Sequence, residues 1–139
     1  MKRIESYRDL VVWQQAMDLV VMCYRITEGF PNNEQFGLTF EVRKTAVSIP
    51  SNIAEGYQRR STGAYLQHLS IASGSQGELG TQLEIARRLG YIQGSAASAT
   101  SEANEDVGRL LYGLSEGVRK RTHSARRAYS FMIPDDPGS

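Results

Sequence analysis

Apolar residues recur at every third or fourth position along most of this chain, and that period most limits what it can fold into. An α-helix turns once in about 3.6 residues, so this spacing gathers the apolar side chains on one helical face. No stretch alternates convincingly between apolar and polar residues with the period of two that marks a half-buried strand. The pattern therefore predicts an all-α protein.

Four periodic segments are separated by short stretches rich in Gly, Pro, Asn and Ser. Short links favour antiparallel neighbours, so we expect one domain, an up-down-up-down four-helix bundle over residues 1–121. Residues 122–139, first basic and then rich in Pro, Asp and Gly, are expected to form a C-terminal tail. The expected helices run from Ser6 or Asp9 to Glu28, from Asn32 to Gly56, from Ser61 to Gly90, and from the stretch Gly94–Ser101 through Val118.

Several residues mark where helices start, stop or bend. Asn32 followed by Gln35 three positions later resembles a capping box. Gly56 fits a left-handed turn at the end of the second helix, and Gly90 fits a Schellman-type stop of the third. Pro50 lies inside the second helix, where it removes one backbone hydrogen bond, so we expect a kink or a break just before it.

The first two expected helices carry more apolar surface than a small bundle needs, because one wide stripe per helix is enough. The first helix has two adjacent stripes: Leu10, Trp13, Met17, Val20 and Tyr24, and Val12, Ala16, Leu19, Cys23 and Ile26. The second helix has two as well: Phe36, Phe40, Val47 and Ala54, and Val42, Ala46, Ile49 and Ile53. The spacing leaves open which stripe of each pair faces the core. The surplus predicts a homo-oligomer with interface candidates Trp13, Val20, Tyr24, Phe36 and Phe40.

Small residues mark a thin face on the third helix. Gly74, Gly77 and Gly80 are spaced three apart. Each glycine costs about 1 kcal/mol in a helix interior relative to Ala. Their presence predicts a close approach of a neighbouring helix, where a side chain would not fit.

The chain lacks the residue sets of the common catalytic and metal sites. Structural zinc takes four Cys or His ligands, and only Cys23, His68 and His123 are available. No Glu-x-x-His pair suits a di-iron bundle, no glycine-rich phosphate loop occurs, and neither histidine stands in the context of a catalytic base. We therefore expect no enzyme, no catalytic residues, no metal and no cofactor.

The N-terminal segment and the lone cysteine bear on location. Met1–Glu5 is charged and precedes no signal-type cleavage site. The most apolar stretch, Leu10 to Cys23, is interrupted by polar residues and is too short to span a bilayer. Cys23 cannot form an internal disulfide, which fits a reducing compartment. We expect a cytoplasmic protein that does not partner with membranes.

The net charge is only +1, but basic residues cluster locally. Residues 118–139 carry five basic and two acidic groups, a balance of +3. Lys and Arg bind phosphates by neutralisation and counterion release. In a ring-shaped oligomer each small cluster would be repeated around the ring and form a belt. The nucleic-acid-binding candidates are Arg43, Lys44, Arg59, Arg60, Arg119, Lys120 and Arg121.

Five segments have a distinctive sequence: Asp9–Ala16, Phe30–Thr39, Ser48–Tyr57, Ile71–Ser75 and Glu78–Leu83. Together they closely resemble the bacterial four-helix-bundle family of 23S rRNA-intervening sequence proteins, to which the accessory variability proteins of diversity-generating retroelements are related. The resemblance covers about residues 6–118. It implies an up-down bundle without a catalytic site, and for several members a homopentamer with a central channel. It also implies, for the retroelement relatives, binding of nucleic acid and a reverse transcriptase through basic surfaces.

The most distinctive segment contains a motif of four residues, Pro50, Asn52, Glu55 and Gly56, which we interpret as structural. Asn52 and Glu55 could satisfy backbone groups that Pro50 leaves without partners. Two functions remain open. One is an adaptor that assembles with copies of itself, as a pentamer by the resemblance, and binds RNA or DNA weakly. The other is a structural module that binds only protein.

Overall fold

The computed structural model describes residues 3–132, with side chains placed for residues 3–121. Two short 3-10 helices precede the first two long helices, and no strand occurs in residues 3–132. The expected all-α four-helix class is confirmed. The elements are η1 (Tyr7–Asp9), α1 (Val11–Thr27), η2 (Asn32–Glu34), α2 (Leu38–Gln58), α3 (Thr62–Arg88) and α4 (Gly94–Met132).

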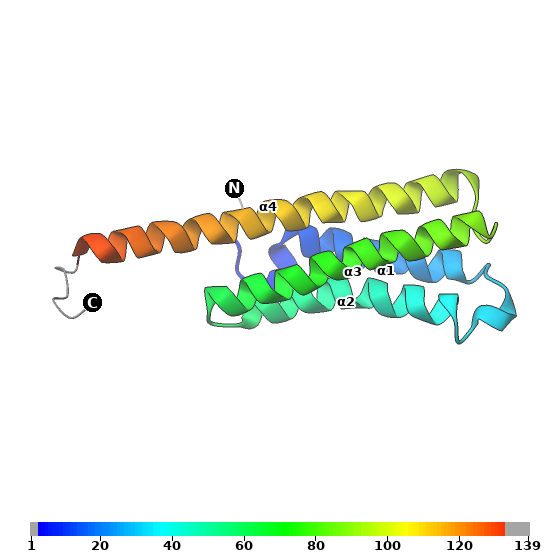
Figure 1. Ribbon diagram of the computed structural model, residues 1–139, viewed down its shortest axis with the longest axis horizontal. Coiled ribbons are helices and arrows are strands. Elements are labelled where there is room, and N and C mark those ends of the chain that lie inside the picture. The colour runs from blue at the N-terminus through cyan, green and yellow to red at the C-terminus, as the bar shows by residue number, and fades with distance from the viewer. Residues whose placement is uncertain (1–2, 133–139) are drawn as a thin grey trace.

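The four long helices lie along one common axis (Figure 1). The α2–α3 loop lies at one end of the bundle, and the connections from α1 to α2 and from α3 to α4 lie at the other. None of the helices in the described part of the chain is long and apolar enough to cross a membrane.

Helix α4 is longer than the other three and runs past the α2–α3 end of the bundle (Figure 1). Its helical backbone continues to Met132, so residues 122–132 of the expected tail extend the last helix. The sequence allows this because no glycine or proline occurs between Gly117 and Pro134. Residues 133–139 lie outside the described part of the chain.

The core contains one of the two apolar stripes of each of the first two helices. The structure therefore shows which stripe faces inward. Val12, Ala16, Leu19 and Cys23 are buried on α1. On α2 the buried set is Val42, Ala46, Ile49 and Ile53. Helix α3 also faces the core, through Leu69, Ala72, Leu79, Leu83 and Ala86. The other stripes of α1 and α2 therefore lie at the surface or at its edge.

Polar pairs fix α3 against its neighbours inside this core. Gln82 Nε2 donates to Thr45 Oγ1 of α2 at 3.0 Å. On the other side, Gln76 Nε2 donates to the Asn104 carbonyl of α4 at 3.1 Å, and Asn104 Nδ2 donates back to the Gln76 carbonyl at 3.2 Å. A buried amide that slides away from its partner loses a hydrogen bond, so these contacts set the register of α3.

Helix α2 continues through Pro50 as one helix, so the break considered above does not occur, and the kink stays a prediction. Asn52 Nδ2 does donate to a backbone carbonyl, that of Ser48, at 2.8 Å. Pro50 has no amide hydrogen, so the carbonyl four residues before it, that of Ala46, is left without its helical partner. Asn52 thus satisfies a different group from the one expected.

Gly56 does not end α2 with a left-handed turn, because its φ is not positive and α2 continues to Gln58. It is buried where α3 comes close: a Cβ there would stand 2.8 Å from His68 Cβ and 3.1 Å from Tyr65 Cδ1. Glycine is needed at this position because a side chain would push α3 away from α2.

The expectations for the other glycines have different outcomes. Gly74 and Gly77 face open space, with nothing within 4 Å of an added Cβ, so the close approach expected there is wrong within the chain. Gly80 lies against Asn104, at 3.2 Å. The Schellman stop is confirmed at Gly90, whose φ is +78°, because the Tyr91 amide donates to the Ala86 carbonyl at 2.9 Å.

The capping box lies at a different place from the one expected. Asn32 and Gln35 make no such pair, since Pro31 precedes η2 without a side-chain cap. Ser6 and Asp9 form the box instead, around η1. Ser61 caps α3 by accepting a hydrogen bond from the Ala64 amide at 3.0 Å.

The two kinds of glycine give a paired test of the fold. Gly56→Ala should lower the free energy of unfolding by about 1–3 kcal/mol, because its methyl group overpacks the α2–α3 contact. Gly74→Ala should raise it by about 0.5–1 kcal/mol, because an exposed helical alanine loses less backbone entropy on folding. Urea unfolding followed by circular dichroism measures both. Equal effects of the two substitutions would contradict the close α2–α3 contact.

Candidate interaction surfaces

The outward stripes of α1 and α2 line one continuous surface, which we call the α1/α2 groove. One part, about 580 Å³ in volume, is lined by Tyr24, Gln35, Phe36, Thr39, Phe40, Arg43, Lys44 and Val47. The other part, about 340 Å³, is lined by Tyr7, Trp13, Met17, Val20, Val47, Pro50, Ser51 and Ala54. Val47 belongs to both, so the two parts adjoin. All five interface candidates from the sequence line this groove.

The groove exposes large apolar side chains to solvent. Phe36 is 88% exposed, Phe40 50% and Tyr24 41%. Trp13 and Val20 are half-buried at its other part. Single exposed apolar residues are ordinary on a protein surface, whereas a contiguous apolar patch marks an interaction site.

The predicted basic pair Arg43 and Lys44 lies in this same groove, which the sequence did not indicate. The Arg43 guanidinium stands 4.7 Å from the centre of the Tyr24 ring. Its Nε donates to Thr27 Oγ1 at 2.8 Å, so Arg43 ties α2 to the end of α1. Lys44 Nζ lies 5.8 Å from the centre of the Phe40 ring. Arg43 is therefore already engaged, and Lys44 is the freer cation of the pair.

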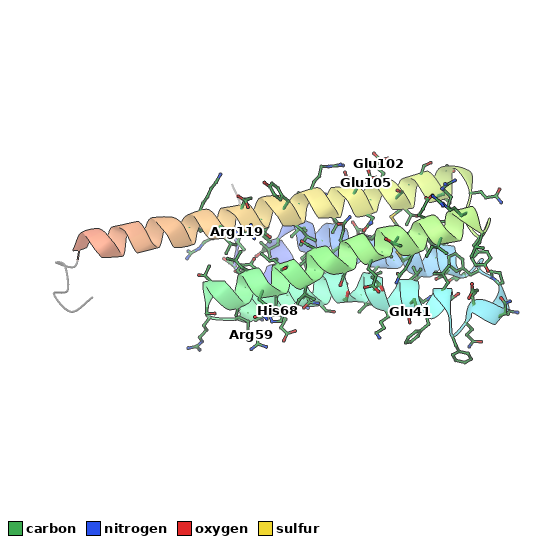
Figure 2. All side chains as sticks on the ribbon, viewed as in Figure 1. Glu41, Arg59, His68, Glu102, Glu105 and Arg119 are labelled. Atoms are coloured by element: carbon green, nitrogen blue, oxygen red, sulfur yellow. The ribbon has the colours of Figure 1, made fainter. Side chains whose placement is uncertain are left out.

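The remaining basic candidates lie at the α2–α3 end of the bundle, two of them just after α2 and three on α4, and we call them the basic end. They are Arg59, Arg60, Arg119, Lys120 and Arg121. Figure 2 labels Arg59 and Arg119 at this end, one at the end of α2 and the other on α4. Helices α3 and α4 pack against each other. Burial raises the pKa of the Tyr65 hydroxyl near the start of α3, and the charge of Arg121 on α4 opposes that rise. Arg43 lies 16 residues before Arg59 on α2, about 24 Å along the helix axis.

Two carboxylates neutralise part of the basic end. Glu55 accepts a hydrogen bond from Arg59 at 2.9 Å, and Glu116 accepts one from Arg119 at 2.6 Å. The bond from Arg59, followed by the charge of His68, lowers the pKa of Glu55 below its ordinary value. The sequence had suggested that Glu55 satisfies a backbone group near Pro50. In the structure Glu55 pairs with Arg59 instead.

Asn52 and Glu55 both point from α2 to the same residue of α3. His68 Nδ1 lies 3.1 Å from Asn52 Oδ1, and His68 Nε2 lies 3.9 Å from Glu55 Oε1. With Gly56 directly beside them, these residues form a close α2–α3 contact. The motif Pro50, Asn52, Glu55 and Gly56 thus has a packing role, and three of its members act on α3.

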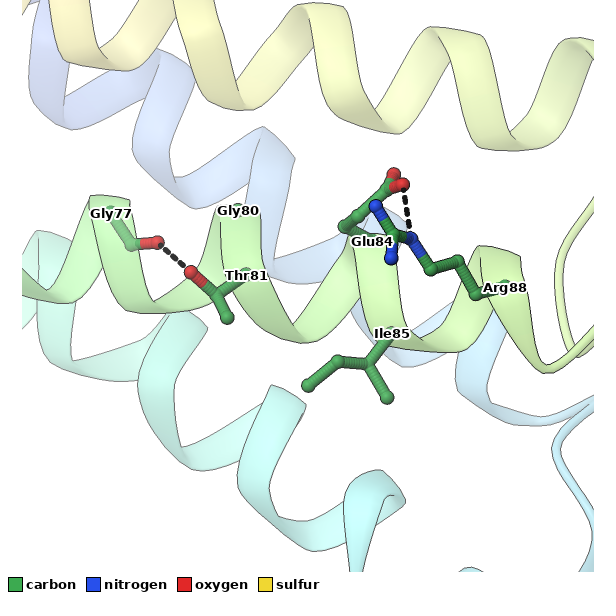
Figure 3. A pocket seen from close by; sticks show the side chains of 6 residues that line it. All are labelled: Gly77, Gly80, Thr81, Glu84, Ile85 and Arg88. Carbon is green, nitrogen blue, oxygen red and sulfur yellow. Dashed lines mark hydrogen bonds and ion pairs between the residues drawn. The ribbon is translucent and has the colours of Figure 1, made fainter.

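A shallow hollow of about 500 Å³ lies on α3, around Gly77, Gly80 and Ile85 (Figure 3). Its one carboxylate, Glu84, binds Arg87 and Arg88 at 2.7 Å and 3.0 Å. The hydrogen bonds from these arginines, Arg87 first, lower the pKa of Glu84 to about 2. A carboxylate that stays ionised at neutral pH cannot donate a proton, so this hollow does not offer a general acid.

Metal chemistry finds no support in the described side chains. Within residues 3–121 there is no group of three or more His, Cys, Asp and Glu placed to hold a metal ion. Cys23 is buried in the core, and desolvation raises its pKa to about 12. A thiol with that pKa is a poor nucleophile at neutral pH.

Comparison with known proteins relates most of this chain to one family. Residues 8–113 match the family described as 23S rRNA-intervening sequence protein. A solved structure of a protein of unknown function from the S23 ribosomal protein family, from Bacteroides thetaiotaomicron, superposes with a TM-score of 0.71 at 21% identity. The match covers 76% of this chain and 96% of that one, and at this identity it supports the shared fold. No curated protein matches the chain.

The two cations of the groove should respond differently to neutralisation. Arg43→Gln should lower the free energy of unfolding by about 1–2 kcal/mol, because it removes charged hydrogen bonds between α2 and α1. Lys44→Gln should change it by less than about 0.5 kcal/mol, as is usual for an exposed substitution. Urea unfolding of both variants tests this difference, which would vanish if Arg43 did not tie the helices together.

Proposed function

Because the chain belongs to the 23S rRNA-intervening sequence protein family, whose fold it has, we propose that it is a non-catalytic helical-bundle adaptor. It assembles with copies of itself, as a pentamer in the form that the resemblance implies. The assembly binds RNA or DNA weakly and with little regard to sequence. The nucleic-acid part of this proposal rests on the five cations that lie at this one end of the bundle.

The basic end suits phosphate better than base recognition. Arg60, Lys120 and Arg121 are exposed and form no ion pair with any residue in the range 3–121. Such cations can neutralise phosphates, which fixes position without reading sequence. One subunit offers few of these contacts, so useful affinity depends on several subunits acting together.

The α1/α2 groove supports the self-assembly part of the proposal. It is apolar and aromatic, and Phe36 is 88% exposed in the single chain. Aromatic residues are enriched in the cores of protein interfaces. A neighbouring subunit that covers the groove would bury these rings. Arg43 and Lys44 then belong to the subunit interface, and the basic end is left to face nucleic acid.

The same groove favours a second candidate, a structural module that binds protein and has no nucleic-acid role. In that case the groove would take part in assembly or hold a protein partner, and the basic end would be an ordinary solvated surface. Nucleic-acid binding therefore decides between the two candidates.

Salt dependence of binding tests the nucleic-acid role. The protein should bind labelled RNA at about 50 mM salt and lose affinity as salt rises. Arg59→Gln with Arg60→Gln should reduce the magnitude of the slope of log K against log salt by about 1.4 for a single-stranded RNA if both residues touch phosphates. Fluorescence anisotropy measures the slope. Absence of binding at low salt, or affinity that does not change with salt, would exclude this role.

A matched control separates local contact from net charge. Arg87→Gln with Arg88→Gln removes the same two charges at the opposite end of the 27-residue α3, about 40 Å away. The slope should stay as in the unchanged protein. An equal reduction by both pairs of substitutions would mean that only the total charge matters.

Light scattering across a dilution series tests self-assembly. The unchanged protein should scatter above the monomer mass, and Phe36→Ser with Phe40→Ser should reduce it to a monomer, because the groove loses its exposed rings. Ile71→Ser is the control, since Ile71 is 47% exposed on α3, away from the groove. A monodisperse monomer of the unchanged protein at micromolar concentration would contradict the proposal.

A further inference from the structure

We propose that the α1/α2 groove takes the outer face of α4 from a second copy of this chain, so that subunits join head to tail and not groove to groove. This surface, the α4 outer face, consists of the exposed residues Glu102, Glu105, Arg109, Tyr112 and Gly113. The inference rests on the self-assembly in the proposed function and names the surface that meets the groove.

The groove carries charge of one sign only. Arg43 and Lys44 are the charged residues that line it, and no carboxylate lines either part. Glu41 is exposed nearby but lies outside the lining. Lys44 is exposed and forms no ion pair with any residue in the range 3–121. Two grooves packed on each other would oppose like charges, which disfavours binding. The groove therefore calls for an occupant that brings carboxylates as well as apolar surface.

The α4 outer face offers both. Glu102 and Glu105 stand one helical turn apart on the outer side of α4 (Figure 2). Neither forms an ion pair with a described side chain, whereas Arg109 on the same face is paired with Asp106. Tyr112 follows Glu105 by one heptad and is 69% exposed, the one exposed aromatic ring of residues 3–121 outside the groove. Two free carboxylates and a ring thus complement a free cation among rings.

One chain cannot make this contact with itself. Helices α2 and α4 each pack against α1 and α3, and in the described part of the chain they do not contact each other. They therefore occupy opposite corners of the bundle. The groove of one subunit can meet the α4 outer face only of another copy. Such a contact between two different surfaces can close a ring, whereas a groove-to-groove contact is two-fold and ends at a dimer.

The two surfaces also match in length and direction. Thr39 and Ala54 line the groove 15 residues apart on α2, about 22 Å along its axis. The α4 outer face spans 11 residues, about 16 Å. Helices α2 and α4 both begin at the same end of the bundle (Figure 1). A neighbour rotated about an axis along the bundle therefore brings its two free carboxylates to the half of the groove that holds Lys44.

Charge reversal on α4 tests the contact. Glu102→Lys with Glu105→Lys should raise the apparent Kd of self-assembly at least about tenfold, because it opposes cations to the groove. Adding Lys44→Glu should recover part of the lost affinity, since the charges are again opposite. Light scattering across a dilution series measures both, with circular dichroism as the check of folding. Absence of any recovery would overturn the pairing of this face with Lys44.

A matched control uses the other pair of neighbouring acidic residues, which lies outside the described part of the chain. Asp135→Lys with Asp136→Lys makes the same change in net charge and should leave assembly unaltered. If this pair weakened assembly and the α4 pair did not, the C-terminal segment would be the occupant and the proposal would be wrong.

Mixing two defective variants distinguishes head-to-tail from groove-to-groove contact. Phe36→Ser with Phe40→Ser damages the groove and keeps the α4 outer face, whereas Glu102→Lys with Glu105→Lys does the reverse. At a concentration where each alone is a monomer, an equal mixture should form a dimer of one copy of each, through the two intact surfaces. A mixture that stays monomeric, or an α4 variant that assembles fully, would overturn the head-to-tail contact and leave self-assembly through the groove standing. A monomeric unchanged protein would overturn both.

Discussion

The close contact between α2 and α3 at Gly56 is the constraint on which the other features depend. It brings α3 near enough for His68 to meet Asn52 and Glu55. With Gln82 bound to Thr45 further along, α3 can occupy only one register on α2. The same placement turns the Phe40 side of α2 away from α3 and toward solvent. The exposed groove and the buried core are thus two results of one helix–helix contact.

The helical class was predictable because it depends on spacing within one segment. The Schellman stop at Gly90 was predictable for the same reason, since it needs only local geometry. The roles of Gly56, Gly74 and Gly77 were not, because a glycine's role depends on which helix lies opposite it. The choice between two apolar stripes on α1 likewise needed the positions of the other helices.

The candidate surfaces were predicted in part. The residues that the sequence marked as interface candidates line the α1/α2 groove, because surplus apolar residues beyond one stripe must face outward. That a partner covers them stays a prediction. It grouped Arg43 with the basic residues, although Arg43 reaches back to Thr27 and contacts Tyr24. Only the fold shows that the cations divide into two sets, one among aromatic rings and one near ion pairs at the end of the bundle. Residue type did not distinguish these two environments.

The family match ends at residue 113, inside α4. Helix α4 continues from there to Met132 without interruption. An unbroken helix fixes rotational phase as well as length, at about 100° and 1.5 Å per residue. The direction in which the extension faces is therefore set inside the bundle, by the reciprocal bonds of Asn104 with Gln76. A single residue inserted near Arg121 would turn the helical residues 122–132 by more than a quarter of a circle while leaving the core contacts within residues 3–121 in place.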